Sequence, residues 1–211
     1  MKSLVLGSLL AIASCRPGPV EPPGPTSQAP ITDEKTELGA FEPPPADPAD
    51  PRGVDGREGE GQLGPAPGGT LVRSDGQRIE VGTLYADRGA VVVFYRGHWC
   101  KPCRTQLEEL QLNIDKLAGL GFSIHAISTD DPSDSAALKQ KLGLGFKLYS
   151  DPGGLAANAW SVYSAEHGMA RPAVFVVRPG GQIAARFVTD SPTHRPPMDE
   201  LLAAAEQASP R

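Results

Sequence analysis

The alternation of apolar and polar positions predicts an α/β domain in the later part of this 211-residue chain. Short runs rich in β-branched and aromatic residues predict strands, at 70–73, 78–81, 90–95, 122–127, 146–149, 173–177 and 182–188. Apolar residues at helical spacing predict helices, after Cys103, at 136–142, around 155–162 and at 197–207. The run 90–95 is apolar at nearly every position and therefore predicts a central strand buried on both faces.

Turn residues indicate how these elements connect. Asp75-Gly76 predicts a hairpin between the first two strands, and Pro179-Gly180-Gly181 predicts another before the last strand. The strand 90–95, the helix after it and the strand 122–127 predict a right-handed βαβ unit. We therefore expect a central mixed sheet flanked by helices.

Residues 16–67 differ in composition from the domain, which we place at 68–208. They hold 13 of the 22 prolines, with ten acidic and four basic residues. Such a segment cannot bury enough apolar surface to offset its ordering entropy, so we expect a disordered, extended tether. From Gly68 on, 15 acidic residues balance 15 basic ones, so the net charge of −5 comes mostly from the tether. The neutrality of the domain argues against a nucleic-acid partner, and we expect none.

Two cysteines follow the predicted central strand and open the next helix. Positions i and i+3 share a helix face, so Cys100 and Cys103 can close a disulfide. The helix dipole and unpaired N–H groups favour a thiolate on Cys100, which we expect at the exposed end as the nucleophile. Cys103, one turn further in, would be more covered and would resolve a mixed disulfide.

Neighbouring residues favour this chemistry. Pro102 suits a first helical turn because its φ is pre-set and it lacks an N–H. Lys101, Arg104, Arg96 and His98 bring positive charge near the leading sulfur, which favours the thiolate further.

Three other interpretations of a Cys-X-X-Cys pair are weaker. Structural zinc needs four ligands, and the histidines show no ligand spacing, so we expect no metal. A haem attachment site needs histidine directly after the second cysteine, where this chain has Arg104. An inert structural disulfide stays open, although closing so short a loop removes little unfolded-state entropy.

The surrounding motif resembles a known fold. Trp99-Cys100-Lys101-Pro102-Cys103 is similar to the Trp-Cys-X-Pro-Cys active site of thioredoxin-fold oxidoreductases. Residues 64–207 resemble the redoxin branch of that fold, the alkyl hydroperoxide reductase and thiol-specific antioxidant (AhpC/TSA) superfamily. Within it, Phe94-Tyr95-Arg96-Gly97-His98-Trp99-Cys100 is similar to peroxiredoxin-like members that read Phe-Tyr-Arg-Gly-X-Trp-Cys. The resemblance implies a thioredoxin-like α/β fold and an active site without a cofactor, supported by Trp99.

Two positions depart from the patterns of these families. Typical peroxiredoxins carry Thr or Ser three residues before the peroxidatic Cys, where this chain has Gly97. Thioredoxins carry a buried acid six residues before the first Cys, where this chain has Phe94. The first departure argues against efficient peroxide activation, and the second means that a base for Cys103 comes from elsewhere or is water.

Two more segments are expected near the dithiol. In the thioredoxin fold a cis-proline opens the strand that faces the cysteines, and Pro172 matches that position. The resemblance implies that the backbone of Arg171 pairs with a bound polypeptide or small thiol, and that its side chain adds positive charge at the thiolate. The alternative is a trans-proline in a surface loop with a solvated Arg171. Asp130 or Asp131 leaves a strand on the rim that carries Cys100, although a helix cap and loop is the simpler interpretation.

Residues 1–15 predict export. One lysine precedes an apolar run of signal-peptide length, too short to span a bilayer. Ile12-Ala13-Ser14-Cys15 resembles a bacterial lipobox, which implies that Cys15 is acylated and anchors the protein in the cell envelope, facing the periplasm. Arg16 in place of Asp after this cysteine resembles lipoproteins that enteric-type bacteria send to the outer membrane, which implies the outer rather than the inner membrane. An ordinary secretory signal with a chance cysteine is the alternative.

Three functions follow from these residues and resemblances. In the first, Cys100 attacks a protein or small-molecule disulfide and Cys103 releases the product. In the second, a hydroperoxide oxidises Cys100 to the sulfenic acid, which condenses with Cys103. In the third, the chain is a surface scaffold whose dithiol does no chemistry. The expected partners are thiols, disulfides or hydroperoxides.

Overall fold

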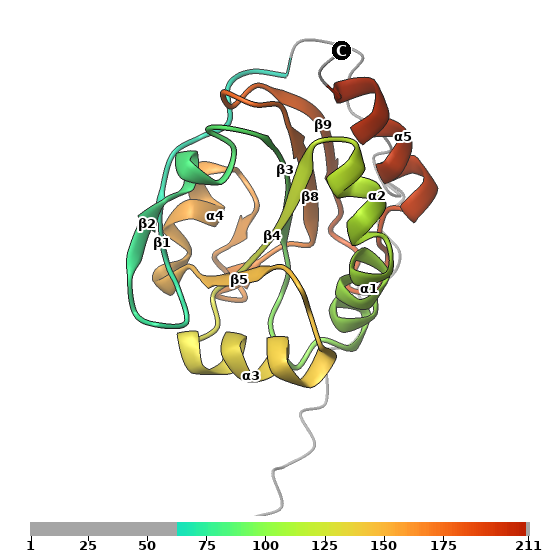
Figure 1. The fold of residues 1–211 in the computed structure, drawn as a ribbon. Coiled ribbons are helices and arrows are strands. Elements are labelled where there is room, and N and C mark those ends of the chain that lie inside the picture. Colours follow the sequence, from blue (N-terminus) through green and yellow to red (C-terminus); the bar gives the residue numbers. More distant parts are fainter. Residues whose placement is uncertain (1–62, 210–211) are drawn as a thin grey trace, which may run out of the picture. The chain divides into compact units, whose positions relative to one another are not determined.

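The computed structural model describes residues 63–209, which form a mixed sheet with helices on both faces (Figure 1). Seven strands run in the order β2-β1-β5-β4-β3-β8-β9. They are β1 (Thr70–Val72), β2 (Arg78–Glu80), β3 (Gly89–Phe94), β4 (Phe122–Ser128), β5 (Lys147–Ser150), β8 (Ala173–Val177) and β9 (Ile183–Val188). A separate two-stranded sheet pairs β6 (Tyr163–Ser164) with β7 (Met169–Ala170). The predicted leader, Cys15 and the tether up to residue 62 lie outside the described residues.

The connections confirm the predicted mixed sheet. β3, β4 and β5 are parallel neighbours, whereas β8 runs antiparallel to β3 and pairs with β9 in the second predicted hairpin. The helices are α1 (Lys101–Leu112), α2 (Ile114–Gly119), α3 (Pro132–Leu142), α4 (Leu155–Ala159) and α5 (Met198–Ala208), with short 3-10 turns η1 (Val81–Leu84) and η2 (Pro152–Gly154). Among these described helices, none is long and apolar enough to cross a membrane.

The central strand is buried on both faces, as its sequence predicts. Val91 and Val93 of β3 belong to a core under α1, α2 and α5, whereas Val92 and Phe94 belong to a second core that includes α4. Figure 1 shows α1, α2 and α5 on one side of the sheet and α4 on the other. Because successive side chains of a strand point to opposite faces, one apolar run serves both cores.

The helix predicted after Cys103 is two helices. It breaks at Asn113, whose backbone leaves the helical region at φ −111°. The side-chain amide of Asn113 donates to the carbonyl of Glu109 at 2.9 Å, a local bond that competes with the backbone ladder. α1 therefore carries the cysteines alone, and α2 continues separately to Gly119.

One rim of the sheet collects the loops expected to carry the site. The register pairs Phe94 at the end of β3 with Ile127 of β4 and with Ala173 at the start of β8. The loops after β3 and β4 and the residues before β8 therefore meet at this rim. At another edge, the N–H of Ala66 donates to the carbonyl of Gly181 at 2.7 Å, so contacts with the domain begin before Gly68.

Candidate active site

The disulfide Cys100–Cys103 spans the first turn of α1. Its Cα atoms lie 5.3 Å apart, within the usual range for a disulfide. Cys100 is the N-cap of the helix, and its Sγ accepts a hydrogen bond from the backbone N–H of Cys103 at 3.3 Å. Pro102 occupies the first turn, as expected. The leading sulfur thus lies at the positive end of the helix dipole, where a thiolate is stabilised.

The expectation that Cys100 is exposed is wrong. Cys100 is only 2% exposed and Cys103 is fully buried, and both belong to the core under α1. Part of the cover comes from the connection between β9 and α5, residues 189–197, whose Arg195 contacts both sulfurs. A helix N-terminus is open to solvent only where no other segment crosses it, and here a distant segment does.

Arg195 is the cation that sequence reasoning missed. One guanidinium nitrogen, Nη2, lies 3.0 Å from Cys103 Sγ and 3.6 Å from Cys100 Sγ. The other, Nη1, donates to the carbonyls of Pro192 and His194. Within residues 63–209 no carboxylate pairs with Arg195. The only sequence signal was an arginine inside the proline-rich connection before the last helix.

Burial and, to a smaller extent, the nearby positive charge of Arg96 lower the pKa of Arg195 to about 10. The side chain still keeps its charge at neutral pH. When the disulfide is reduced, a cation held beside the two sulfurs stabilises the one that becomes a thiolate.

Arg96 and Trp99 form the second cationic contact of the site. The guanidinium carbon of Arg96 lies 5.0 Å from the centre of the Trp99 ring, a cation–π distance. Burial lowers the pKa of Arg96. Trp99 is 39% exposed, which makes it a large aromatic surface beside the disulfide. Lys101 is exposed at the start of α1 and takes no part in this stack.

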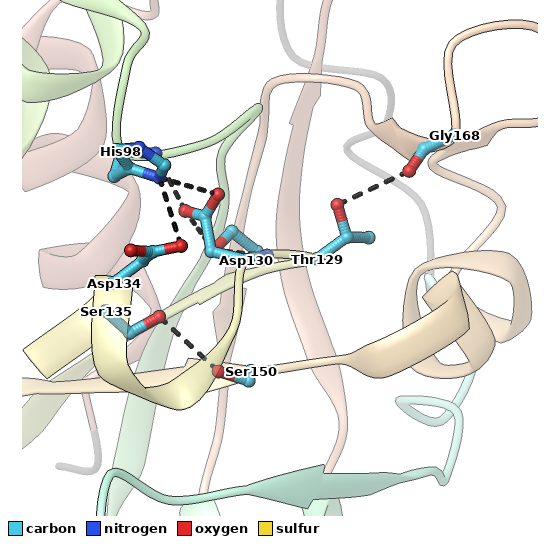
Figure 2. Close-up of polar contacts among 8 residues, drawn as sticks. His98, Thr129, Asp130, Asp134, Ser135, Ser150 and Gly168 are labelled. Carbon is cyan, nitrogen blue, oxygen red and sulfur yellow. Dashed lines mark hydrogen bonds and ion pairs between the residues drawn. The ribbon is translucent and has the colours of Figure 1, made fainter. Parts of the chain in front are cut away.

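Asp130 holds the loop that leads to the cysteines. Its carboxylate accepts the backbone N–H of His98 at 2.7 Å and the hydroxyl of Ser128 at 2.9 Å. The His98 ring lies between two carboxylates, 3.1 Å from Asp130 and 3.9 Å from Asp134, as Figure 2 shows. Of the two aspartates considered from sequence, Asp130 thus lies at the site, and Asp131 is the exposed N-cap of α3.

More of this rim is tied together by weaker polar contacts. Figure 2 also shows the hydroxyl of Thr129 bonded to the carbonyl of Gly168, at 3.4 Å, and the hydroxyls of Ser135 and Ser150 facing each other at 3.5 Å. These contacts link the loop after β4 to the β6–β7 hairpin, and α3 to β5.

Gly97 leaves room for the Trp99 indole. A Cβ at position 97 would lie 2.6 Å from Nε1 of Trp99 and 3.0 Å from a carboxylate oxygen of Asp130. The indole edge therefore occupies the space next to position 97, where a threonine or serine side chain would begin. The departure from the peroxiredoxin pattern at Gly97 thus has a steric reason, because Trp99 fills the space that a threonine or serine side chain would need.

The expectations for Arg171 and Pro172 need correction. The Arg171–Pro172 peptide bond is trans. The N–H of Arg171 donates to the carbonyl of Val162 at 2.6 Å, and the carbonyl of Pro172 accepts from Thr189 at 3.1 Å, so these backbone groups are already paired.

The Arg171 side chain also lies elsewhere than expected. It donates to Asp190 at 2.7 Å and to the carbonyl of Ser161 at 2.6 Å, and none of its contacts involves the sulfurs. Asp190, an acid close in space that the resemblance did not reveal, sets the direction of the Arg171 side chain. Arg195 supplies the cation expected from Arg171.

Comparisons with known proteins agree with this geometry. Residues 64–186 match the AhpC/TSA family, which is more than half of the chain. An alkyl hydroperoxide reductase C of Staphylococcus saprophyticus is 32% identical over 108 residues, covering 47% of this chain and 54% of that protein. A chloroplastic peroxiredoxin Q of Suaeda salsa is 31% identical over 105 residues, covering 50% of this chain and 48% of that protein. The chain spans about half the length of these curated relatives.

A solved structure shares the fold. The structure of reduced Prx3 from Vibrio vulnificus, in complex with H2O2, aligns with a TM-score of 0.63 at 17% identity, over 69% of this chain and 99% of that one. This likeness confirms the thioredoxin-like fold expected from the Trp-Cys-X-Pro-Cys motif.

Proposed function

The chain belongs to the AhpC/TSA family, and from this membership and the geometry of its dithiol we propose that it is a thiol-dependent oxidoreductase that cycles Cys100 and Cys103 between dithiol and disulfide. The observation that carries the proposal is the closed disulfide at the N-terminus of α1 with Arg195 against both sulfurs. An inert structural bridge gains nothing from a half-buried cation beside it, whereas a thiolate is stabilised by one.

The first reaction is thiol–disulfide exchange. The Cys100 thiolate attacks one sulfur of a substrate disulfide, forms a mixed disulfide and displaces one substrate thiolate. Cys103, after losing its proton to solvent, then attacks Cys100 Sγ and releases the second substrate thiolate. The substrate gains two electrons, the enzyme dithiol loses two, and solvent protonates the products. The Trp99-Cys100-Lys101-Pro102-Cys103 motif and the absence of a hydroxyl at Gly97 favour this reaction.

The second candidate reaction consumes a hydroperoxide. The Cys100 thiolate attacks the terminal peroxide oxygen, becomes the sulfenic acid and releases an alcohol or water after proton uptake. The Cys103 thiol then condenses with the sulfenic acid and releases water, which gives the same disulfide. This candidate is supported by the family and by the names of the relatives, which are alkyl hydroperoxide reductases and peroxiredoxins.

Rapid mixing separates the two reactions. The reduced protein is mixed with hydrogen peroxide, and separately with a disulfide-bonded protein, while Trp99 fluorescence reports formation of the Cys100–Cys103 bond. We expect fast exchange with the disulfide substrate. Peroxide consumption no faster than that of free cysteine would eliminate the second reaction. Cys100→Ser should abolish both, and an unchanged rate in this variant would mean that the chain is a scaffold.

We also propose that the protein works in the cell envelope as a lipoprotein anchored through Cys15, with its domain facing the periplasm. The support is the apolar run before Ile12-Ala13-Ser14-Cys15 and the length of the proline-rich segment that follows. Labelling of expressing cells with an alkyne-bearing fatty acid should mark the wild-type protein and the Cys100→Ala control, but not Cys15→Ala. Equal labelling of Cys15→Ala would contradict the anchor.

A further inference from the structure

Two arginines flank Cys100, and neither has a negative partner among residues 63–209. Nη2 of Arg195 lies 3.6 Å from Cys100 Sγ, and Arg96 stacks on the ring of Trp99, the residue before Cys100. Both arginines are half-buried. Burial, and then the charge of Arg96, lower the pKa of Arg195, so the two cations lie close enough to repel each other. Around a neutral disulfide they form a local excess of positive charge.

The acids of this rim already have partners. Asp130 and Asp134 face the ring of His98, as Figure 2 shows, and Asp190 pairs with Arg171. Arg96 and Arg195 therefore remain half-buried cations whose lost hydration no counterion in the described part of the chain offsets. A bound anion would offset this cost.

The same two guanidinium groups hold unused hydrogen-bond donors. Nε of Arg195 is buried, and no group in residues 63–209 accepts a hydrogen bond from it. Within the same range, the contact of the Arg96 guanidinium is the face of the Trp99 ring, which accepts no ordinary hydrogen bond. A guanidinium presents its N–H groups as a planar fork, which suits two oxygens of a carboxylate, sulfate or phosphate group. The missing acceptor is therefore of the oxoanion type.

A cleft gives an anion a path to Arg195. The cleft has a volume of about 470 Å³ and lies between α1 and residues 193–198, with Arg195 and Lys101 in its lining. Glu109, the carboxylate among its described lining residues, lies about two helical turns from Lys101. The part of the cleft nearest the disulfide is therefore positive.

We propose that Arg96 and Arg195 form a binding site for an oxoanion, which is occupied while Cys100 and Cys103 are joined in the disulfide. The dependence on redox state rests on the proposed function. When a dithiol reductant opens the disulfide, the two cysteines gain two electrons and one proton, and one of them remains a thiolate. The reductant becomes a disulfide and gives its second proton to solvent. The new thiolate replaces the oxoanion as the counterion of the arginines, and the oxoanion leaves.

Binding is measured first, with inorganic sulfate as the probe. Titration calorimetry of the full-length oxidised protein, at an ionic strength held constant with sodium chloride, should show saturable binding. Arg96→Met and Arg195→Met should each weaken it by about tenfold, the loss expected for one charge-assisted hydrogen-bonding group.

Arg178→Met is the matched control. β8 begins at the rim with Ala173, and the exposed Arg178 follows the opposite end of that strand. This variant should bind sulfate like wild type. Absence of saturable binding, or an equal loss of affinity in Arg178→Met, would overturn the proposal.

The wild type alone tests the link to redox state, without a variant whose folding could differ. With sulfate at about ten times its Kd, the equilibrium with dithiothreitol should shift about tenfold toward the Cys100–Cys103 disulfide, because sulfate binds that state. Sodium chloride of the same ionic strength should leave the equilibrium where it was. Equal effects of the two salts would reduce the result to general screening and overturn the proposal.

Small disulfides then distinguish a free oxoanion from one that the substrate carries. As Cys100 attacks, its negative charge passes to the leaving sulfur, so a substrate carboxylate can take its place beside the arginines. If the substrate carries the anion, dithiodiglycolate should exceed the neutral bis(2-hydroxyethyl) disulfide about tenfold in kcat/KM, and Arg96→Met should remove the difference. Equal values of kcat/KM would assign the site to a free oxoanion.

Failure of this site and failure of the proposed function give different results. Turnover with dithiothreitol and a disulfide substrate, but no saturable sulfate binding, would reject the site and leave the oxidoreductase. Sulfate binding that depends on Arg96 and Arg195, without turnover of any disulfide or peroxide, would reject the proposed function and leave the site.

Discussion

Two half-buried bases in this domain, Arg195 and His125, lack a carboxylate partner among the described residues and respond in opposite ways. His125 lies within the sheet, with its ring nitrogens 2.9 Å from the hydroxyl of Ser123 and 3.2 Å from that of Tyr149. Burial lowers its pKa to about 4, helped by the positive charges of Lys147 and Arg88. His125 is therefore neutral at physiological pH, and its burial costs little there.

Arg195 cannot respond in this way. Its pKa, lowered to about 10, still leaves it charged at neutral pH, and its acceptors are backbone carbonyls and the two sulfurs. In the disulfide these sulfurs are neutral, and on reduction one of them becomes an anion. His125 can lose its proton and so be accommodated by the fold as a neutral group, whereas Arg195 cannot and gains its counterion from the chemistry of the site.

The largest expected effect is acid destabilisation through His125. Its pKa in the folded protein, about 4, lies below the ordinary value of 6.5, so the unfolded chain binds the proton first as the pH falls. The stability is complete above about pH 6.5 and is lost progressively below it, by roughly 3 kcal/mol at pH 4. Urea unfolding of wild type and His125→Gln at several pH values measures this difference.

His167 provides the control for this titration. It is exposed, and His167→Gln should keep the pH dependence of the wild type. His125→Gln should instead lose part of its acid sensitivity while costing some stability at neutral pH. The same pH slope in both variants would show that His125 is not held neutral by the fold.

The next largest effect is expected on the unfolding free energy when a side chain is added at Gly97. This change tests whether the Trp99 ring holds Arg96 near Arg195. Gly97→Ala puts a Cβ 2.6 Å from Nε1 of Trp99, the ring on which Arg96 stacks. Forcing an atom into this contact should cost about 1–3 kcal/mol of unfolding free energy. Gly119→Ala is the control, because a Cβ there meets nothing within 4 Å.

A double-mutant cycle assigns this cost to the indole. If Trp99 causes the strain, Gly97→Ala should be better tolerated in a Trp99→Leu background, with a coupling energy clearly different from zero. Additive effects of the two changes would contradict the steric account of Gly97.

The third prediction concerns the charge of Arg195 itself. Arg195→Met keeps most of the side-chain volume but no charge, so the thiolate loses its neighbouring counterion. The thiolate fraction of the reduced protein at slightly acidic pH should fall by about tenfold, a change of about 1.4 kcal/mol. The thiolate absorbance near 240 nm, followed against pH, measures it, and Arg195→Lys should restore part of the effect.

The same variant has a redox consequence with a definite sign. Only the reduced state contains a thiolate, so Arg195 stabilises that state relative to the disulfide. Its loss should shift the equilibrium with glutathione about tenfold toward the disulfide, or about 30 mV toward a more reducing potential. A shift in the other direction would contradict the role given to Arg195.

What the sequence predicts here depends on how far apart the interacting residues lie in the chain. Cys100 and Cys103 share one helical turn, and the both-sided burial of β3 follows from one apolar run, so both are predictable. Arg195 lies 95 residues from Cys100, and no periodicity connects them. Part of the cover that buries Cys100 comes from the same distant connection, which explains why its exposure was predicted wrongly.

The smallest effect is expected at Arg171, the arginine that the resemblance had placed at the thiolate. Its ion pair with Asp190 joins side chains that are 34% and 51% exposed, and such pairs contribute about 0–1 kcal/mol. Arg171→Met should therefore lower the unfolding free energy by less than about 1 kcal/mol. It should leave the pH titration of the thiolate absorbance unchanged, because the guanidinium contacts Asp190 and Ser161, not sulfur. Arg171→Met and Arg195→Met are measured side by side. An equal loss of thiolate in both variants would show that positive charge at a distance, and not contact with Arg195, stabilises the anion.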